Sequence, residues 1–278
     1  MSPRPRRSGA GGWAAIAVGL AGLPAVAHAE DGPGEPPPVS VSRGVDGEEG
    51  APAPAAVSAQ TAAFLPSALA ATSEGRRGLA SVMTGWDQAR RGRIYDTSAE
   101  AQLSGPVSVS AGARYDGPGT VASPHVELRL DALRQAAHGL DLAVAAGYVD
   151  AGFNTVPAAV FTLAAGRRVG RSYLLGNVAY GQGLQDGERS GELRLAALRS
   201  ITGAVQVGID TRLQIDLERD HDEPAGETDW ESRTGLVASY AWDRFVVMSS
   251  AGVAALRLRA AGPTAVGPVI TAGFGTVF

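Results

Sequence analysis

Apolar and polar residues alternate along much of this chain, and the clearest case runs from Val205 to Glu218. The odd-numbered positions of this segment hold Val, Ile, Leu and Thr, whereas the even-numbered positions hold Gln, Gly, Asp, Arg and Glu. Side chains of a strand point alternately to opposite faces, and a helix would scatter both sets around its circumference. The segment is therefore predicted to be a β-strand with one apolar face and one polar face.

Comparable segments follow one another from about residue 78 to the end of the chain, separated by turn-forming Gly, Pro, Asp and Asn residues. The predicted strands are 94–104, 107–116, 125–134, 140–150, 160–169, 173–184, 192–201, 205–218, 231–242, 245–259 and 267–278. Tight connections, such as Gly105-Pro106 and Asp243-Arg244, alternate with longer ones, such as 117–124 and 219–230. The pattern indicates an antiparallel sheet with short turns at one end and long loops at the other.

A first strand at about 79–88 completes the set, although its alternation is poor. An even number of strands returns the chain to the side from which it started, and bacterial single-chain barrels have even strand numbers. The fold class predicted is all-β, namely a transmembrane antiparallel up-and-down β-barrel of about 12 strands. Its domain would extend over residues 78–278.

Aromatic residues fall near the predicted strand ends, which is where the two membrane interfaces of a barrel would lie. The set near the long loops is Tyr95, Tyr115, Tyr148, Phe161 and Trp230, and the set near the short turns is Tyr173, Trp242, Phe245 and Phe278. A soluble β-sandwich or lipocalin-like barrel would instead place its aromatic residues in the core. The positions favour a membrane barrel.

The last strand ends on Phe278, after Ile270, Ala272, Phe274 and Thr276 on the same face. This ending resembles the closing strand of Gram-negative outer-membrane β-barrel proteins, a porin-like class in which a terminal Phe is an assembly signal. The resemblance covers about residues 78–278 and implies a β-barrel fold and a location in the outer membrane. The resemblance implies contact with outer-membrane lipid, with lipopolysaccharide and with the outer-membrane assembly machinery. It also implies that Phe278 is the signal that this machinery recognises.

The N-terminus reads as a secretory signal peptide of residues 1–29. Three arginines precede a short apolar run from Ala14 to Val26, and Ala27-His28-Ala29 supplies a small-x-small cleavage site. Residues 30–77 are rich in Pro, Gly and Ala, and we expect a largely disordered periplasmic linker there. The chain contains no Cys, so a disulfide framework and a lipid-anchored cysteine are excluded.

Composition narrows the function classes further. Removal of the signal leaves 21 arginines against 28 acids, a net charge of −7. Phosphate neutralisation supplies most nucleic-acid affinity, so no nucleic acid is expected as a partner. No cofactor motif is present, and no cofactor, catalytic residue or metal ligand is assigned.

The polar face of the strands carries both signs of charge, and it is predicted to line the lumen. The candidate lining residues are Arg114, Glu127, Arg129, Asp131, Glu192, Arg194, Asp210, Arg212 and Asp216. They form either a structural lattice of ion pairs that fills a narrow interior or the wall of a polar pore. Twelve strands lie between side-chain-filled and open barrels, so both interpretations are physically possible.

The expected function is a small outer-membrane channel for ions or small solutes, or a structural outer-membrane protein. One alternative is a barrel hydrolase with its site in the external loops, where the acidic loop 219–229 contains His221 and His125 lies at a strand end. The acidic loop is also a weak candidate for divalent cations, although its spacing is not that of an EF-hand. A further alternative is an autotransporter-like translocator, but residues 30–77 hold no passenger domain.

Overall fold

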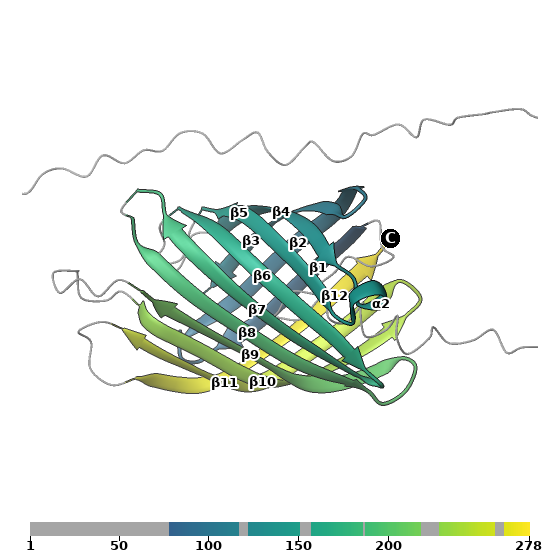
Figure 1. Ribbon diagram of the computed structural model, residues 1–278. Coiled ribbons are helices and arrows are strands. Elements are labelled where there is room, and N and C mark those ends of the chain that lie inside the picture. The colour runs from purple at the N-terminus through teal and green to yellow at the C-terminus, as the bar shows by residue number, and fades with distance from the viewer. Residues whose placement is uncertain (1–77, 117–121, 151–156, 186, 218–227, 259–263) are drawn as a thin grey trace, which may run out of the picture. The chain divides into compact units, whose positions relative to one another are not determined.

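The computed structural model describes residues 78–116, 122–150, 157–185, 187–217, 228–258 and 264–278. The predicted signal peptide and linker, together with most of the acidic loop, lie outside these residues. Within them the chain forms a twelve-stranded antiparallel barrel with one short helix (Figure 1).

The strands are β1 Gly78–Asp87, β2 Gly92–Ser104, β3 Val107–Asp116, β4 Ser123–Leu133, β5 Asp141–Val149, β6 Ala158–Val169, β7 Ser172–Gly183, β8 Arg189–Ser200, β9 Val205–Asp216, β10 Thr228–Trp242, β11 Phe245–Leu258 and β12 Ala265–Val277. Each strand pairs with its neighbours in the chain, and β1 pairs with β12 from Leu79↔Val277 to Asp87↔Val269. Two backbone hydrogen bonds extend this seam to Gly78 and Phe278: the N–H of Gly78 donates to the carbonyl of Phe278 at 2.8 Å, and the N–H of Phe278 donates to the carbonyl of Gly78 at 3.0 Å. The sheet is thus closed and has no free edge.

One end of the barrel carries the short connections, and we call it the short-turn end. Two-residue turns join β2 to β3, β6 to β7 and β10 to β11. The backbone at Gly170 and at Asp243 is left-handed there, with φ of 58° and 51°. Such φ angles let a hairpin reverse within two residues, and glycine and aspartate are among the residues that tolerate them. The opposite end, which carries longer connections such as 217–227, is the long-loop end.

A single helical turn, α2 Gln135–His138, connects β4 and β5 at the short-turn end. The side chain of Gln135 accepts a hydrogen bond from the backbone N–H of Arg168 at 2.6 Å and donates one to the Arg168 carbonyl at 2.8 Å. These bonds satisfy the part of β6 that extends beyond its partner β5. Among the described residues, no helix has both the length and the hydropathy needed to span a membrane.

The two faces of the barrel wall differ as the alternation predicts. Large apolar side chains on the outer face are exposed, for example Leu236 at 71%, Ile270 at 59% and Leu128 at 54%. Their strand neighbours on the inner face are buried, including charged groups such as Asp210. An apolar exterior around a polar interior is the reverse of a soluble protein and is the arrangement of a transmembrane barrel.

The predicted fold class is confirmed, and the predicted strands, including the poorly alternating first one, match the observed strands to within three residues at each end. One aromatic assignment is wrong. Tyr173 does not belong to an interfacial belt, because its side chain is only 4% exposed and packs inside the barrel. At the short-turn end the outer-face aromatic residues Trp242, Phe245 and Phe274 pack together instead, with ring centroids 5.7 to 6.4 Å apart.

Candidate functional site in the barrel lumen

The inner face of the described strands is rich in charge, and acids outnumber arginines on it. The acids are Asp87, Asp96, Glu100, Glu127, Asp131, Asp141, Glu192, Asp210, Asp216 and Glu231, and the arginines are Arg114, Arg129, Arg168, Arg194, Arg212 and Arg233. The nine candidate lining residues named from the sequence are all in this set. The charges come from β1–β6 and β8–β10, whereas the inner faces of β7, β11 and β12 carry none.

A cluster on β8 and β9 joins one carboxylate to two guanidinium groups. The guanidinium of Arg212 donates to both carboxylate oxygens of Glu192, at 2.8 and 3.3 Å, and to Oε1 of Gln214 at 2.6 Å. Arg194 pairs with the same carboxylate. One acid thus holds two arginines, which leaves the cluster with a net positive charge. Bidentate pairing of this kind fixes both side chains against the wall.

The wall formed by β4 faces this cluster. Arg129 donates to Asp131 at 3.1 Å, and both side chains are more than nine-tenths buried. Glu127 interacts electrostatically with Arg194 of β8 as well as with Arg129. Because β4 and β8 are four strands apart, charges on separate parts of the wall act on one another through the lumen.

A second ionic cluster lies near the long-loop end and joins strands that are not neighbours. Nε of Arg233 on β10 lies 3.2 Å from Oδ2 of Asp87 on β1 and 2.8 Å from Oε1 of Glu231. Arg90, from the β1–β2 connection, also pairs with Glu231, and its backbone N–H donates to Asp87. Asp87 is 1% and Glu231 is 2% exposed, so the carboxylates of this cluster are shielded from solvent.

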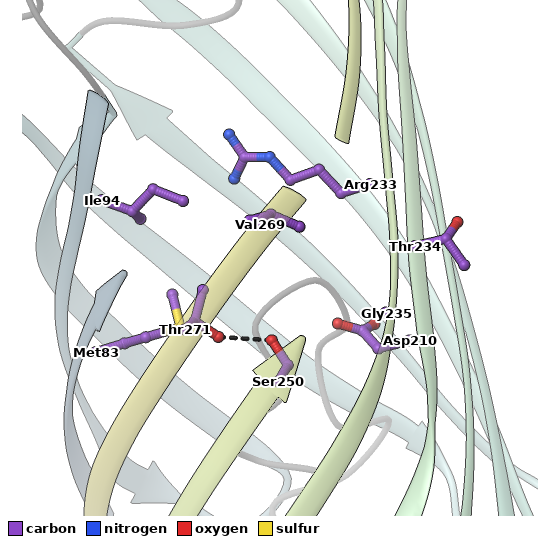
Figure 2. A pocket seen from close by; sticks show the side chains of 9 residues that line it. All are labelled: Met83, Ile94, Asp210, Arg233, Thr234, Gly235, Ser250, Val269 and Thr271. Carbon is purple, nitrogen blue, oxygen red and sulfur yellow. Dashed lines mark hydrogen bonds between the residues drawn. The ribbon is translucent and has the colours of Figure 1, made fainter. Parts of the chain in front are cut away.

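A small cavity of about 30 Å³ lies on the inner side of the wall beside this cluster (Figure 2). Asp210 and Arg233 line it, together with Ser250 and Thr271, whose hydroxyls share a hydrogen bond of 2.6 Å. Apolar side chains, among them Ile94, complete the lining. The space has room for one or two waters or a small ion and is far smaller than a drug-sized pocket.

Apolar side chains pack together in the lumen at the short-turn end, beside buried polar residues such as Gln206 and Ser239, and we call the apolar group the apolar layer. Its members are Leu79, Tyr173, Leu175, Ala196, Leu198, Val237, Ala241, Val246 and Met248, with Val277 packed against them. They come from β1, β7, β8, β10 and β11, and each is at most 7% exposed. Side chains that faced an open, water-filled lumen would be exposed, so the layer is a constriction.

The two histidines considered for a hydrolase site differ in what the structure describes of them. His125, which the hydrolase alternative placed at a strand end, shares the inner face of β4 with Glu127, and both lie within electrostatic reach of Arg194. Gly112 of β3 makes room for its ring, since a Cβ there would lie 2.7 Å from His125 Cε1. His221 and the acidic loop around it fall outside the described residues. Alternation alone did not indicate the apolar layer or the pairing of Asp87 with Arg233.

Comparison with known proteins gives the fold and no closer relative. No protein-family model and no curated protein matches the sequence. Among solved structures, the NanC porin matches at a TM-score of 0.52 and 10% identity, covering 71% of this chain and 98% of its own. The KdgM porin matches at 0.45 and 10%, covering 72% and 99%. Omp33 of Acinetobacter baumannii matches at 0.39 and 11%, covering 73% and 98%.

The first of these matches, together with the closed barrel and its apolar exterior, leads to one conclusion. At 10% identity the likeness concerns architecture, and no narrower group is indicated. This chain has the fold of the β-barrel porins and channels of the Gram-negative outer membrane.

Proposed function

We propose that this protein is a narrow outer-membrane channel that passes small cations and small neutral solutes in preference to anions. The observation that carries the proposal is the excess of acids over arginines on the inner face, which remains when Arg90 of the β1–β2 connection is counted. Acidic side chains around a pore favour cations, because they raise the local concentration of cations and oppose the entry of anions.

The permeation path has two parts with different tasks. The ionic clusters of β8–β10 and β4 supply fixed charges and hydrogen-bonding groups along the wall. The apolar layer at the short-turn end is interrupted by only a few polar side chains, such as Gln206 and Ser239, so we expect it to set the barrier to conduction. Conduction therefore requires side-chain motion within this layer, and the unit conductance should be small.

The test is single-channel recording in planar bilayers with protein purified from outer membranes. The proposal expects discrete, small steps, and a lower cation conductance in the variant Asp210→Asn, whose side chain lies in the lumen. Asp243→Asn, in an exposed turn, is the matched control and should leave the steps unchanged. A cation conductance that is the same in both variants and in the unmodified protein contradicts the proposal.

A second candidate function is a structural barrel with a filled lumen. The observation that favours it is the burial of the lumen side chains, including Asp87, Arg129 and Glu231. This candidate predicts a protein that gives no steps in any salt but resists SDS unfolding until it is heated. Recording the same preparation before and after heating distinguishes the two functions.

We infer that the protein reaches the membrane through a signal peptide cleaved after Ala29 and that Phe278 directs assembly. Two observations support this: the small-x-small pattern at Ala27 and Ala29, and the exposure of residue Phe278, at 60%, beside the β1–β12 seam. Residues 30–77 would then be a periplasmic linker. Lipopolysaccharide and the assembly machinery are the expected partners. Sequencing the N-terminus of the protein recovered from outer membranes tests the proposed cleavage site. Cleavage after Ala29 predicts Glu30 as the first residue.

A further inference from the structure

The outer rim of the short-turn end carries an unbalanced set of arginines. Arg134, Arg167, Arg171 and Arg199 are exposed there, and we call them the arginine arc. In the described part of this half of the barrel, no Asp or Glu side chain lies on the outer face of a strand. Among the described residues of this rim, the one exposed acid is Asp243, in the β10–β11 turn on the other side of β9.

The arc follows consecutive strands. Arg167 of β6 is paired with Leu174 of β7, and Arg199 of β8 is paired with Ser172 of the same strand. The two arginines therefore flank β7 on the outer face, about 12 Å apart, because two strand spacings combine with an offset of two residues along β7. Arg171 lies in the turn that joins β6 to β7, between them.

The backbone that carries the arc is held firmly. Gln135 of α2 bonds to both backbone groups of Arg168, as described above, and its own N–H donates to Asp141 at 2.7 Å. Arg134 directly precedes Gln135, so these bonds fix its position beside the end of β6. Inside the barrel, the guanidinium of Arg168 lies 6.0 Å from the ring centroid of Tyr173 and anchors the same hairpin.

Apolar side chains lie on the membrane side of the arc. Leu163 of β6 and Leu195 of β8 are 48% and 44% exposed on the same outer face, each four residues further from the short-turn end than Arg167 and Arg199, whereas Leu174 of β7, at 49%, stands beside Arg167. A surface with arginines at the rim and leucines towards the mid-plane matches a phospholipid, whose phosphate is bound at the rim and whose acyl chains lie along the wall. The short-turn end of such barrels faces the periplasm, so the leaflet concerned is the inner, phospholipid leaflet.

The long-loop end differs in composition. Its exposed outer arginines Arg93, Arg189 and Arg257 are accompanied by carboxylates, and Arg257 lies 3.5 Å from Asp229. Charge on that rim is mixed, whereas the arc is positive throughout. We propose that the arginine arc binds the headgroups of anionic phospholipids in the periplasmic leaflet and so anchors the β6–β8 side of the barrel there. This inference does not rest on channel activity.

The test is electron spin resonance of the protein in phosphatidylcholine vesicles that contain a trace of spin-labelled phosphatidylglycerol or spin-labelled phosphatidylcholine. The measured quantity is the ratio of the two lipids in the motionally restricted shell. An arginine near an anionic surface contributes about fivefold to such binding, before screening by salt. We expect a severalfold preference for phosphatidylglycerol that falls as salt is raised.

The variant R167Q/R171Q/R199Q should lower the ratio towards one. Its matched control, R93Q/R189Q/R257Q, removes the same number of arginines from the other rim and should keep the preference. Equal retention of both labels by the unmodified protein, or an equal loss in both variants, overturns the proposal. So does an unchanged ratio in the first variant, which would assign the arc to a periplasmic partner. Heat-modified migration in SDS verifies that each variant is folded, and R171Q alone, in a turn, serves if the triple variant is not.

Discussion

Met248 offers the sharpest test of the apolar layer. Its side chain is 3% exposed, on the inner face of β11. Substitution by Ala removes three buried groups, at about 0.8 kcal/mol each, or about 2.4 kcal/mol of transfer free energy. A residual cavity with room for two waters, about 60 Å³, adds about 1.4 kcal/mol at 24 cal/mol per Å³. We therefore expect Met248→Ala to lower the free energy of unfolding by about 4 kcal/mol.

Urea unfolding of the refolded protein in phospholipid vesicles measures this change, through the midpoint at constant slope. The same variant should raise the unit conductance, since the constriction loses part of its filling. Val247→Ala, one residue away and facing lipid, is the control and should leave the conductance unchanged. A loss of stability below about 1 kcal/mol together with unchanged conductance would refute the constriction, because a side chain in an open lumen costs little to remove.

Three further predictions concern the lumen, the seam and the N-terminus. Arg233→Met should lower the free energy of unfolding by about 3 kcal/mol in the same urea assay, because the substitution leaves two buried carboxylates without their shared cation. Arg257→Met, at an exposed pair, should change this free energy by less than about 1 kcal/mol. Equal effects of the two substitutions would contradict the buried cluster. Deletion of Phe278 should reduce the amount of protein assembled in outer membranes several-fold, as measured by heat-modified migration, and an undiminished yield would remove its role as a signal. Ala29→Arg should block processing, seen as a precursor of higher mass, and normal processing would place the cleavage site elsewhere.

Sequence alone predicted the barrel because alternation and connection length are local properties. The first strand is instructive, since its own pattern was poor and only the need for an even number of strands required it. The structure places it at Gly78–Asp87, hydrogen-bonded to both β2 and β12. The nine candidate lining residues were named from the sequence because, in a membrane, a charged side chain on a strand whose other face is apolar can point only away from the lipid.

What the sequence did not give depends on contacts across the closed barrel. The apolar layer is built from residues such as Val246 and Met248, and β11 is apolar on both faces there, so alternation does not separate them. Tyr173 was assigned to the outer face because an aromatic residue at a strand end is typical of a membrane interface. The pairing of Asp87 with Arg233 joins strands that are three apart in the sheet, and only the closure of the barrel brings them together.

The reversal potential of single channels under a tenfold KCl gradient tests the central claim most directly. The excess of acids on the inner face predicts a potential of the sign given by potassium permeation, reduced in size when Asp210 is replaced by Asn. A potential of the sign given by chloride permeation, or one that Asp210→Asn leaves unchanged, would contradict an acidic permeation path through this lumen.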